Sequence, residues 1–107
     1  MTSSPRTHDP VTLISTFSVD PAKTDALIDL LDRTTDEVIR HMPGFMSASL
    51  HVSEDRRQVI DYAVWRSRDA VDYMRAHPDA RDHMMAAEHL ADATMPVVCN
   101  IRVTHDR

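Results

Sequence analysis

Glycine is nearly absent from this sequence, because Gly44 is the only one among 107 residues. Dinucleotide- and phosphate-binding loops need several glycines, since the backbone must approach the phosphates closely. The sequence therefore contains no recognisable nucleotide-binding loop. Many cofactors bind without such a loop, so the scarcity of glycine argues against a bound cofactor but does not exclude one.

Cysteine and clustered basic residues are also scarce. Cys99 is the only cysteine, which excludes an internal disulfide and a Cys-x-x-Cys metal or redox pair. The formal net charge is −5, and the Lys and Arg residues are scattered along the chain. No basic stripe is available to neutralise a run of phosphates, so we expect no nucleic-acid partner.

Long apolar runs are missing from the start of the chain. Residues 1–10 are rich in Ser, Thr, Pro, His and Asp, which is typical neither of a signal peptide nor of a spanning helix. We expect a flexible N-terminal arm over residues 1–10, no contact with membranes and a soluble cytoplasmic protein. The hydrophobic content of 42% is enough for one core, so residues 11–107 are expected to form a single domain.

The remaining sequence predicts alternating strands and helices. Val11, Leu13, Phe17 and Val19 alternate with polar residues and predict a first strand. Asp20-Pro21 predicts the start of a helix that runs to about His41. The further predicted elements are strands over 45–52 and 59–65, a helical region after Ser67 that is interrupted at His77-Pro78, and a last strand over 97–103.

This order predicts an α+β fold with a four-stranded antiparallel βαββαβ sheet and helices on one face. The strand that runs into Trp65 is the most strand-like segment, and we expect it at the centre of the sheet. Helices on one face leave the other face apolar and uncovered. Two copies packed sheet to sheet would bury it, so we expect a homodimer.

Asp61 and Trp65 are the first candidates for chemistry. With Ala63 they alternate onto one sheet face, so a carboxylate and an indole share a wall. A tryptophan in a sheet is more often a core residue than a catalytic one. The carboxylate of Asp61 must find donors, face solvent or have a raised pKa, and the last case would make it a usable base.

The position of His51 depends on the hairpin register. A tight turn at Asp55-Arg56 would place Leu50 opposite Asp61, whereas a one-residue bulge would bring His51 there instead. The sequence does not decide between the two. The other histidines of the second helical region are spaced six apart, which does not place them on one helical face as a metal site would require.

Several long side chains are candidates for a pocket. Six methionines form a soft apolar set that would line an adaptable pocket for a flat ligand or simply fill the core: Met42, Met46, Met74, Met84, Met85 and Met95. Three arginines would steer an anionic ligand or lie as ordinary solvated charges: Arg66, Arg68 and Arg81.

Two segments carry a resemblance to a known family. These are PGFMSASLH at residues 43–51 and, after a charged turn, DYAVWRS at residues 61–67. Together with the flanking helix and the closing strand, they resemble the antibiotic biosynthesis monooxygenase family. The likeness extends over nearly the whole chain from Val11 and is greatest to the small quinone-forming monooxygenases of aromatic polyketide pathways.

The resemblance implies a dimeric α+β barrel of ferredoxin-like subunits. It also implies oxidation of an anthrone or phenol by O2 without metal, flavin or haem. In that family the match to Trp65 donates its indole N–H to a substrate oxygen, and the match to His51 is among the polar pocket groups. We therefore expect Trp65, Asp61 and His51 to be catalytic. The expected substrate-binding residues are Leu50, Phe45, Tyr62, Val71, Met74, Met84 and Arg81.

The sequence departs from the family at several positions. Asp61 stands where the family commonly has Asn, and a carboxylate donates no hydrogen bond unless it is protonated. Leu50 and Val71 stand where some relatives have Tyr. Haem-degrading relatives use an Asn on the first strand, where this chain has Ser15 and Thr16. This difference weakens the case for a haem-degrading enzyme, which remains an alternative together with a non-catalytic ligand-binding domain and a cyclase or isomerase on the same scaffold.

Overall fold

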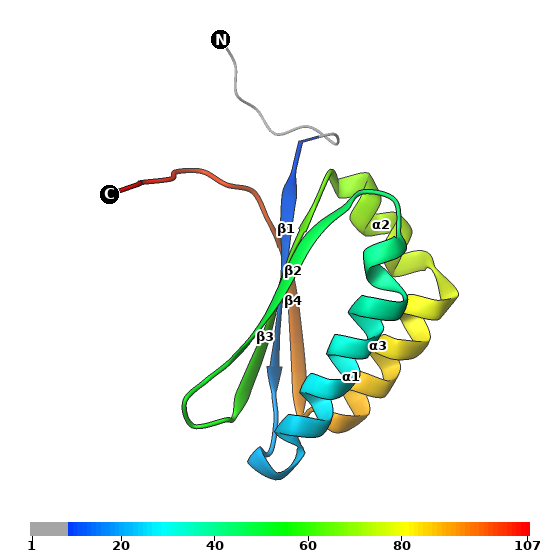
Figure 1. The fold of residues 1–107 in the computed structure, drawn as a ribbon, viewed down its shortest axis with the longest axis vertical. Helices are drawn as coiled ribbons and strands as arrows, with labels where there is room; N and C mark the ends of the chain where they lie inside the picture. The colour runs from blue at the N-terminus through cyan, green and yellow to red at the C-terminus, as the bar shows by residue number, and fades with distance from the viewer. Residues whose placement is uncertain (1–8) are drawn as a thin grey trace.

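The computed structural model describes residues 9–107 as a four-stranded antiparallel sheet covered on one face by helices (Figure 1). Most of the expected N-terminal arm, residues 1–8, lies outside the described residues. In chain order the elements are β1 (Val11–Ser18), the 3-10 turn η1 (Pro21–Lys23), α1 (Thr24–Glu37), the 3-10 turn η2 (Ile39–His41), β2 (Phe45–Val52), β3 (Gln58–Trp65), α2 (Arg68–Ala76), α3 (Pro78–Leu90) and β4 (Ala93–Cys99). The predicted α+β ferredoxin-like fold is confirmed.

The centre of the sheet is formed by β3 and β1, since the strand order is β2-β3-β1-β4. This confirms that the strand running into Trp65 is central. In the antiparallel ladder between these strands, Val11 pairs with Trp65 and Ser15 pairs with Asp61. Directly paired residues point to the same face of a sheet, so all four side chains lie on the face that the helices cover.

The hairpin between β2 and β3 has one definite register. Leu50 pairs with Asp61, and His51 pairs with Ile60. This is the register expected for a tight turn, so a bulge near His51 is excluded. An irregularity does occur at the other end of β2, where the ladder skips Met46.

The first helical segment begins where the sequence predicts, but its α-helical part ends before His41. The side chain of Asp20 accepts a hydrogen bond from the backbone N–H of Ala22 at 2.9 Å, which caps the segment. The α-helix stops at Glu37, because Val38 leaves helical geometry with φ −124° and ψ −62°. A separate 3-10 turn then completes the segment to His41.

The second helical region is split into two helices at the predicted proline. Ser67 caps α2 by accepting a hydrogen bond from the N–H of Ala70 at 3.2 Å. Pro78 is the first residue of α3, a position where its missing N–H costs nothing. The ring Nδ1 of His77 accepts a hydrogen bond from the N–H of Asp79 at 3.2 Å and caps α3.

The last strand differs from the prediction. The sequence predicts a strand over 97–103 that Pro96 precedes, but β4 begins at Ala93, contains Pro96 and ends at Cys99. Proline is tolerated there because β4 is an edge strand whose only partner is β1. The apolar side chains of Ile101 and Val103 follow the strand and are exposed.

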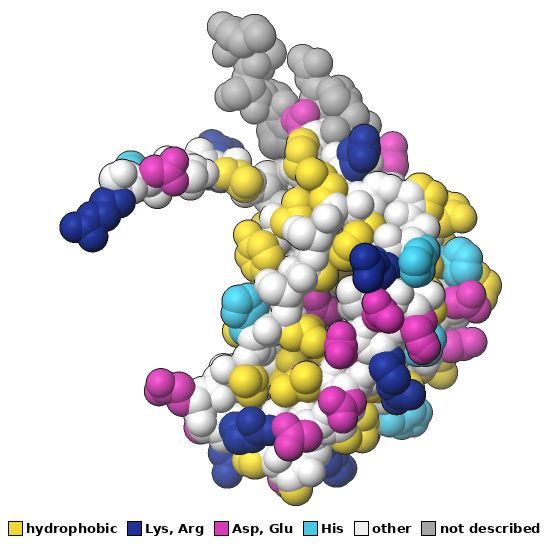
Figure 2. Space-filling view, viewed as in Figure 1, with side chains coloured by type: hydrophobic (Ala, Val, Ile, Leu, Met, Phe, Trp, Pro, Cys, Tyr) yellow, Lys and Arg dark blue, Asp and Glu magenta, His cyan; other side chains and the backbone are white. Residues whose placement is uncertain are grey.

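The two faces of the sheet have different environments. All the helices lie on one side (Figure 1), where the largest fully buried side chains are those of Trp65, Phe17, Leu27, Val59 and Val71. The other face is uncovered and leaves Tyr62, Met95 and Val97 exposed. Figure 2 shows hydrophobic side chains along the strands, whereas most of the visible histidines and many charged side chains lie over the helices.

Gly44 is required by the close approach of α2. Its φ is +86°, and a Cβ at this position would lie 2.4 Å from the Cβ of Ala70. We expect Gly44→Ala to lower the free energy of unfolding by about 2–4 kcal/mol, measured by urea denaturation, because the backbone is strained and α2 must shift. Ala70→Gly removes this contact but not the backbone strain. A double-mutant cycle should therefore show coupling between the two positions, and additive effects would contradict the contact.

Candidate active site

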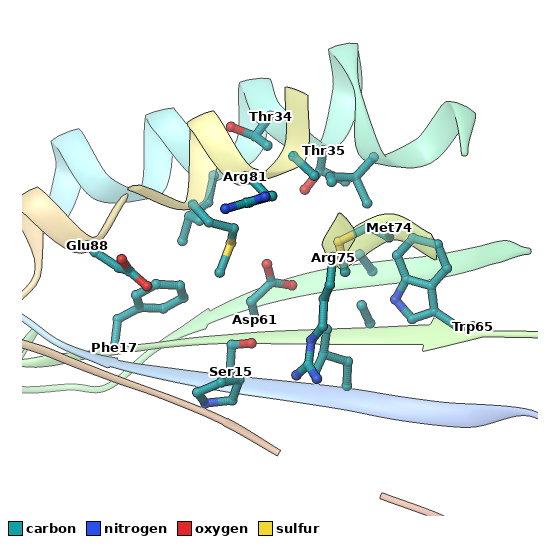
Figure 3. A pocket seen from close by; sticks show the side chains of 18 of the residues that line it. Ser15, Phe17, Thr34, Thr35, Asp61, Trp65, Met74, Arg75, Arg81 and Glu88 are labelled. Carbon is teal, nitrogen blue, oxygen red and sulfur yellow. The ribbon is translucent and has the colours of Figure 1, made fainter. Parts of the chain in front are cut away.

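A cavity of about 280 Å³ lies between the sheet and the helices. Its floor is formed by side chains of β1, β2 and β3, its roof by the helices, and one edge by Pro96 of β4. Figure 3 shows the polar and charged members of this wall together with Phe17, Met74 and Trp65. Most of the lining is apolar: Leu13, Phe17, Leu31, Ile39, Ala48, Ala63, Trp65, Met74, Ala80, Met84, Met85 and Pro96.

Trp65 forms one end of the cavity floor. Its side chain is fully buried, and its ring meets that of Phe45 edge to face with centroids 5.4 Å apart and planes at 87°. The indole Nε1 is buried and has no hydrogen-bond partner among the described residues. A buried N–H without a partner is costly, so this donor is suited to an oxygen atom of a bound ligand.

Asp61 lies further along the same floor and points into the cavity (Figure 3). Burial raises the pKa of its carboxyl group from the ordinary value of 3.8 to about 6, because the charged form loses its hydration. Its Oδ1 atom is buried and has no hydrogen-bond partner among the described residues. A carboxylate with this pKa is a usable general base near neutral pH.

The two unpartnered atoms belong to residues that are separated along one wall. Asp61 and Trp65 are four residues apart on β3, which corresponds to about 13 Å along the strand. A flat ligand of several fused rings would lie across the apolar floor between them, with one oxygen at the indole and another at the carboxyl group.

The structure brings half of the expected site residues together. Asp61, Trp65, Met74, Met84 and Arg81 all line the cavity.

Three further expected residues lie behind its surface. Phe45 and Val71 pack with Trp65 in one part of the core, and Leu50 packs against the other part, around Phe17. They shape the wall without lining it.

His51 and Tyr62 do not line this cavity. Each directly follows a residue of the covered face, Leu50 and Asp61, so each points to the uncovered face. Tyr62 is 41% exposed there, and the Nε2 of His51 lies 3.0 Å from the hydroxyl of Ser49. Neither side chain reaches this cavity, because the hairpin register excludes both from its wall.

Several cavity residues were not identified from the sequence. Ser15 is the clearest, and a signal was present, because it alternates with Leu13 and Phe17 on the apolar face of β1. Arg75, Thr35 and Glu88 come from helices, and nothing in their local sequence distinguishes them from surface residues. Only the packing of the helices over the sheet brings them to the cavity.

The charged residues at the cavity are not paired with one another. Among residues 9–107, neither Arg75 nor Arg81 makes an ion pair, whereas Arg40 and Arg68 each pair with an aspartate one helical turn away. Within the same part of the chain, no group of three or more His, Cys, Asp or Glu side chains is placed to hold a metal ion. No described helix is long and apolar enough to cross a membrane.

The chain is similar to named oxygenases in sequence and in structure. It is 40% identical over 97 residues to the tetracenomycin-F1 monooxygenase of Streptomyces glaucescens, which covers 91% of this chain and 84% of that protein. It matches the ActVA-Orf6 monooxygenase of Streptomyces coelicolor, solved with nanaomycin D, with a TM-score of 0.83, 30% identity and 94% of each chain covered. It matches SnoaB, a cofactor-independent oxygenase of Streptomyces nogalater, with a TM-score of 0.75, 26% identity and coverage of 90% and 96%.

A family model agrees with these likenesses. The model described as antibiotic biosynthesis monooxygenase matches residues 10–86. This range contains all three strands of the cavity floor and most of its helical roof, including Asp61 and Trp65. The chain therefore belongs to the antibiotic biosynthesis monooxygenase family.

Proposed function

We propose that this protein is a monooxygenase that uses O2 to oxidise a polycyclic aromatic phenol or anthrone to a quinone without a bound cofactor. The observation that carries the proposal is the pair of unpartnered buried polar atoms, Trp65 Nε1 and Asp61 Oδ1, on one apolar cavity wall. Such a wall is complementary to a flat ring system with an oxygen at each end.

The chemistry requires little from the protein. Asp61 removes a proton from the substrate, and the resulting anion is electron-rich enough to reduce O2 itself. One oxygen atom enters the product as a carbonyl, the other leaves as water, and the substrate supplies all the electrons. Trp65 binds a substrate oxygen whose negative charge grows in the reaction, and the apolar walls keep water away from the anion.

Named relatives support the substrate class. The tetracenomycin-F1 monooxygenase is named for a polyketide, ActVA-Orf6 was solved with the ligand nanaomycin D, and SnoaB is described as cofactor-independent. These proteins share the fold and the family of this chain. We therefore assign an aromatic polyketide as the substrate class of this cavity.

We further propose that the protein is a homodimer that pairs the uncovered faces of two sheets. Met95 is 67% exposed on this face and Val97 is 46% exposed, and Tyr62 of β3 lies on the same face, separated from Val97 by Ile14 of β1. Exposed apolar groups that cluster on one face favour association. A second copy presents the same face and would bury these side chains without covering the cavity.

The proposed reaction predicts O2 uptake by purified, metal-free protein with a simple anthrone such as dithranol. Trp65→Phe keeps the ring packing but removes the N–H, so we expect kcat/KM to fall roughly 10- to 100-fold, as for a lost hydrogen bond to a charged group. Thermal unfolding of the variant serves as the control for stability. An unchanged rate would remove Trp65 from the mechanism. Turnover only with added haem or flavin, or product formation without O2, would refute the reaction.

Asp61→Asn separates the two effects of this carboxyl group. The variant should lose about 10²- to 10⁴-fold in kcat, because it has no base. At neutral pH the variant should be more stable than the wild type, although it is less active. Since the folded pKa of about 6 lies above 3.8, the folded protein binds the extra proton, and wild-type stability falls as pH rises from about 4 to 6. The loss amounts to about 3 kcal/mol, and Asn does not show it. Urea denaturation at pH 4 and pH 7 measures this, and equal pH dependence of the two proteins would contradict a buried, titrating Asp61.

The dimer proposal predicts a change of mass in solution. Val97→Glu places a charge on the uncovered face, and we expect sedimentation velocity to show monomers where the wild type shows dimers. Tyr73→Glu is the matched control, because Tyr73 is 54% exposed on α2, does not line the cavity and lies away from this face. A monomeric wild type, or a dimeric Val97→Glu, would count against this interface.

A further inference from the structure

We propose that Ser15 and Asp61 act as a pair on one substrate oxygen, with Asp61 taking its proton and Ser15 donating a hydrogen bond to the oxygen as it becomes negative. The inference rests on the proposed function. It assigns to Ser15 the role of a hydrogen-bond donor that touches the substrate, and it makes a hydroxyl group at this end of the ring system part of what the site recognises.

The register of the central strands places the two side chains together. Ser15 pairs directly with Asp61 across the β1–β3 ladder, and both line the cavity (Figure 3). Directly opposed residues have Cβ atoms about 4.5–5.5 Å apart. The two side chains make no hydrogen bond to each other, and Asp61 Oδ1 has no partner. A ligand oxygen above the pair would therefore reach both.

The location of Ser15 is itself unusual. Its side chain is 6% exposed, on a strand face otherwise occupied by Val11, Leu13 and Phe17. An apolar residue would fill this position without leaving a hydroxyl group to be satisfied. The presence of the Ser15 hydroxyl in the cavity wall beside Asp61 is explained if a substrate oxygen is its hydrogen-bond partner.

Four other donors of the site, those of Trp65, Thr34, Arg75 and Arg81, are less suitable for this oxygen, and Thr35 belongs to the helical roof rather than to the floor. The backbone of Trp65 lies about 13 Å further along β3, and its indole N–H is proposed to bind the oxygen at the other end of the ligand. The hydroxyl of Thr34 already donates to the backbone carbonyl of Leu30 at 2.7 Å. Arg75 and Arg81 are exposed residues of the helical wall, so water screens their charge.

The proton transfer is complete without a further reactant. The substrate O–H bond breaks, the proton forms a new O–H bond on the carboxylate of Asp61, and the electron pair stays on the substrate oxygen. Ser15 keeps its own proton throughout and donates a hydrogen bond to the oxyanion. Donation to the charged form stabilises it more than the neutral phenol, so Ser15 lowers the pKa of the bound hydroxyl.

This effect is measurable without turnover. The probe is 2-hydroxyanthraquinone, a product-like ligand with one phenol whose visible absorbance changes on ionisation. A pH titration of the bound probe gives the pKa of its hydroxyl in each protein. We expect Ser15→Ala to raise this pKa by about one unit relative to wild type. Ser15→Thr, which keeps the hydroxyl, should restore the wild-type value.

The controls keep the result specific. Thr16→Val removes a neighbouring hydroxyl from the opposite face of β1 and should leave the pKa of the bound probe unchanged. If Ser15→Ala fails to fold, Ser15→Cys, a weaker donor of similar size, replaces it and should also raise the pKa. Equal pKa values in wild type and the donor-deficient variant, or no saturable binding of the probe to wild type, would overturn the proposal.

Anthrone oxidation distinguishes this proposal from the proposed function. If the pKa of the bound probe differs between wild type and Ser15→Ala as expected but wild type consumes no O2, the pairing of Ser15 with Asp61 is supported and the monooxygenase activity is refuted. If Ser15→Ala takes up O2 with unchanged kcat and an unchanged pH profile, the monooxygenase activity is supported and the role of Ser15 is refuted. If both hold, Ser15→Ala lowers kcat roughly tenfold, and Thr rescues it.

Discussion

The pairing of β3 with β1 is the constraint on which the rest of the structure depends. It places Ser15 opposite Asp61 and Val11 opposite Trp65, and it directs all four side chains to the face that the helices cover. Because side chains alternate along a strand, a slip of one residue would turn each of them to the other face. The cavity floor and both unpartnered polar atoms thus have one origin, the register of two central strands.

The helices change the properties of the polar groups on this cavity floor by excluding water from it. Their apolar side chains remove the hydration of Asp61, which raises its pKa to about 6, and they leave Trp65 Nε1 without a partner. Both effects cost folding free energy, since buried polar groups are normally hydrogen-bonded. The site thus lowers the folding stability of the protein, and in return it offers a ligand polar groups that have no hydrogen-bond partner in the protein.

The same alternation gives the sheet a second, different face. Residues that follow the site residues along β2 and β3, among them His51 and Tyr62, point away from the helices. Without a helical layer, the apolar side chains there stay exposed. One property of β-strands therefore explains both the reaction cavity on one face and the proposed dimer contact on the other.

The sequence by itself determined the order of the elements, the central place of the strand ending at Trp65, the split at Pro78 and the common face of Asp61 and Trp65. These are local properties: period-two alternation, helix caps and proline geometry. It did not determine the extent of β4, because whether Pro96 is tolerated depends on which edge of the strand is paired. Only the tertiary structure decided that His51 lies outside the cavity and that Arg75 lines it, whereas the face of Ser15 was already encoded by the alternation along β1. Register and helix packing bring together residues distant in sequence, and no local pattern encodes those contacts.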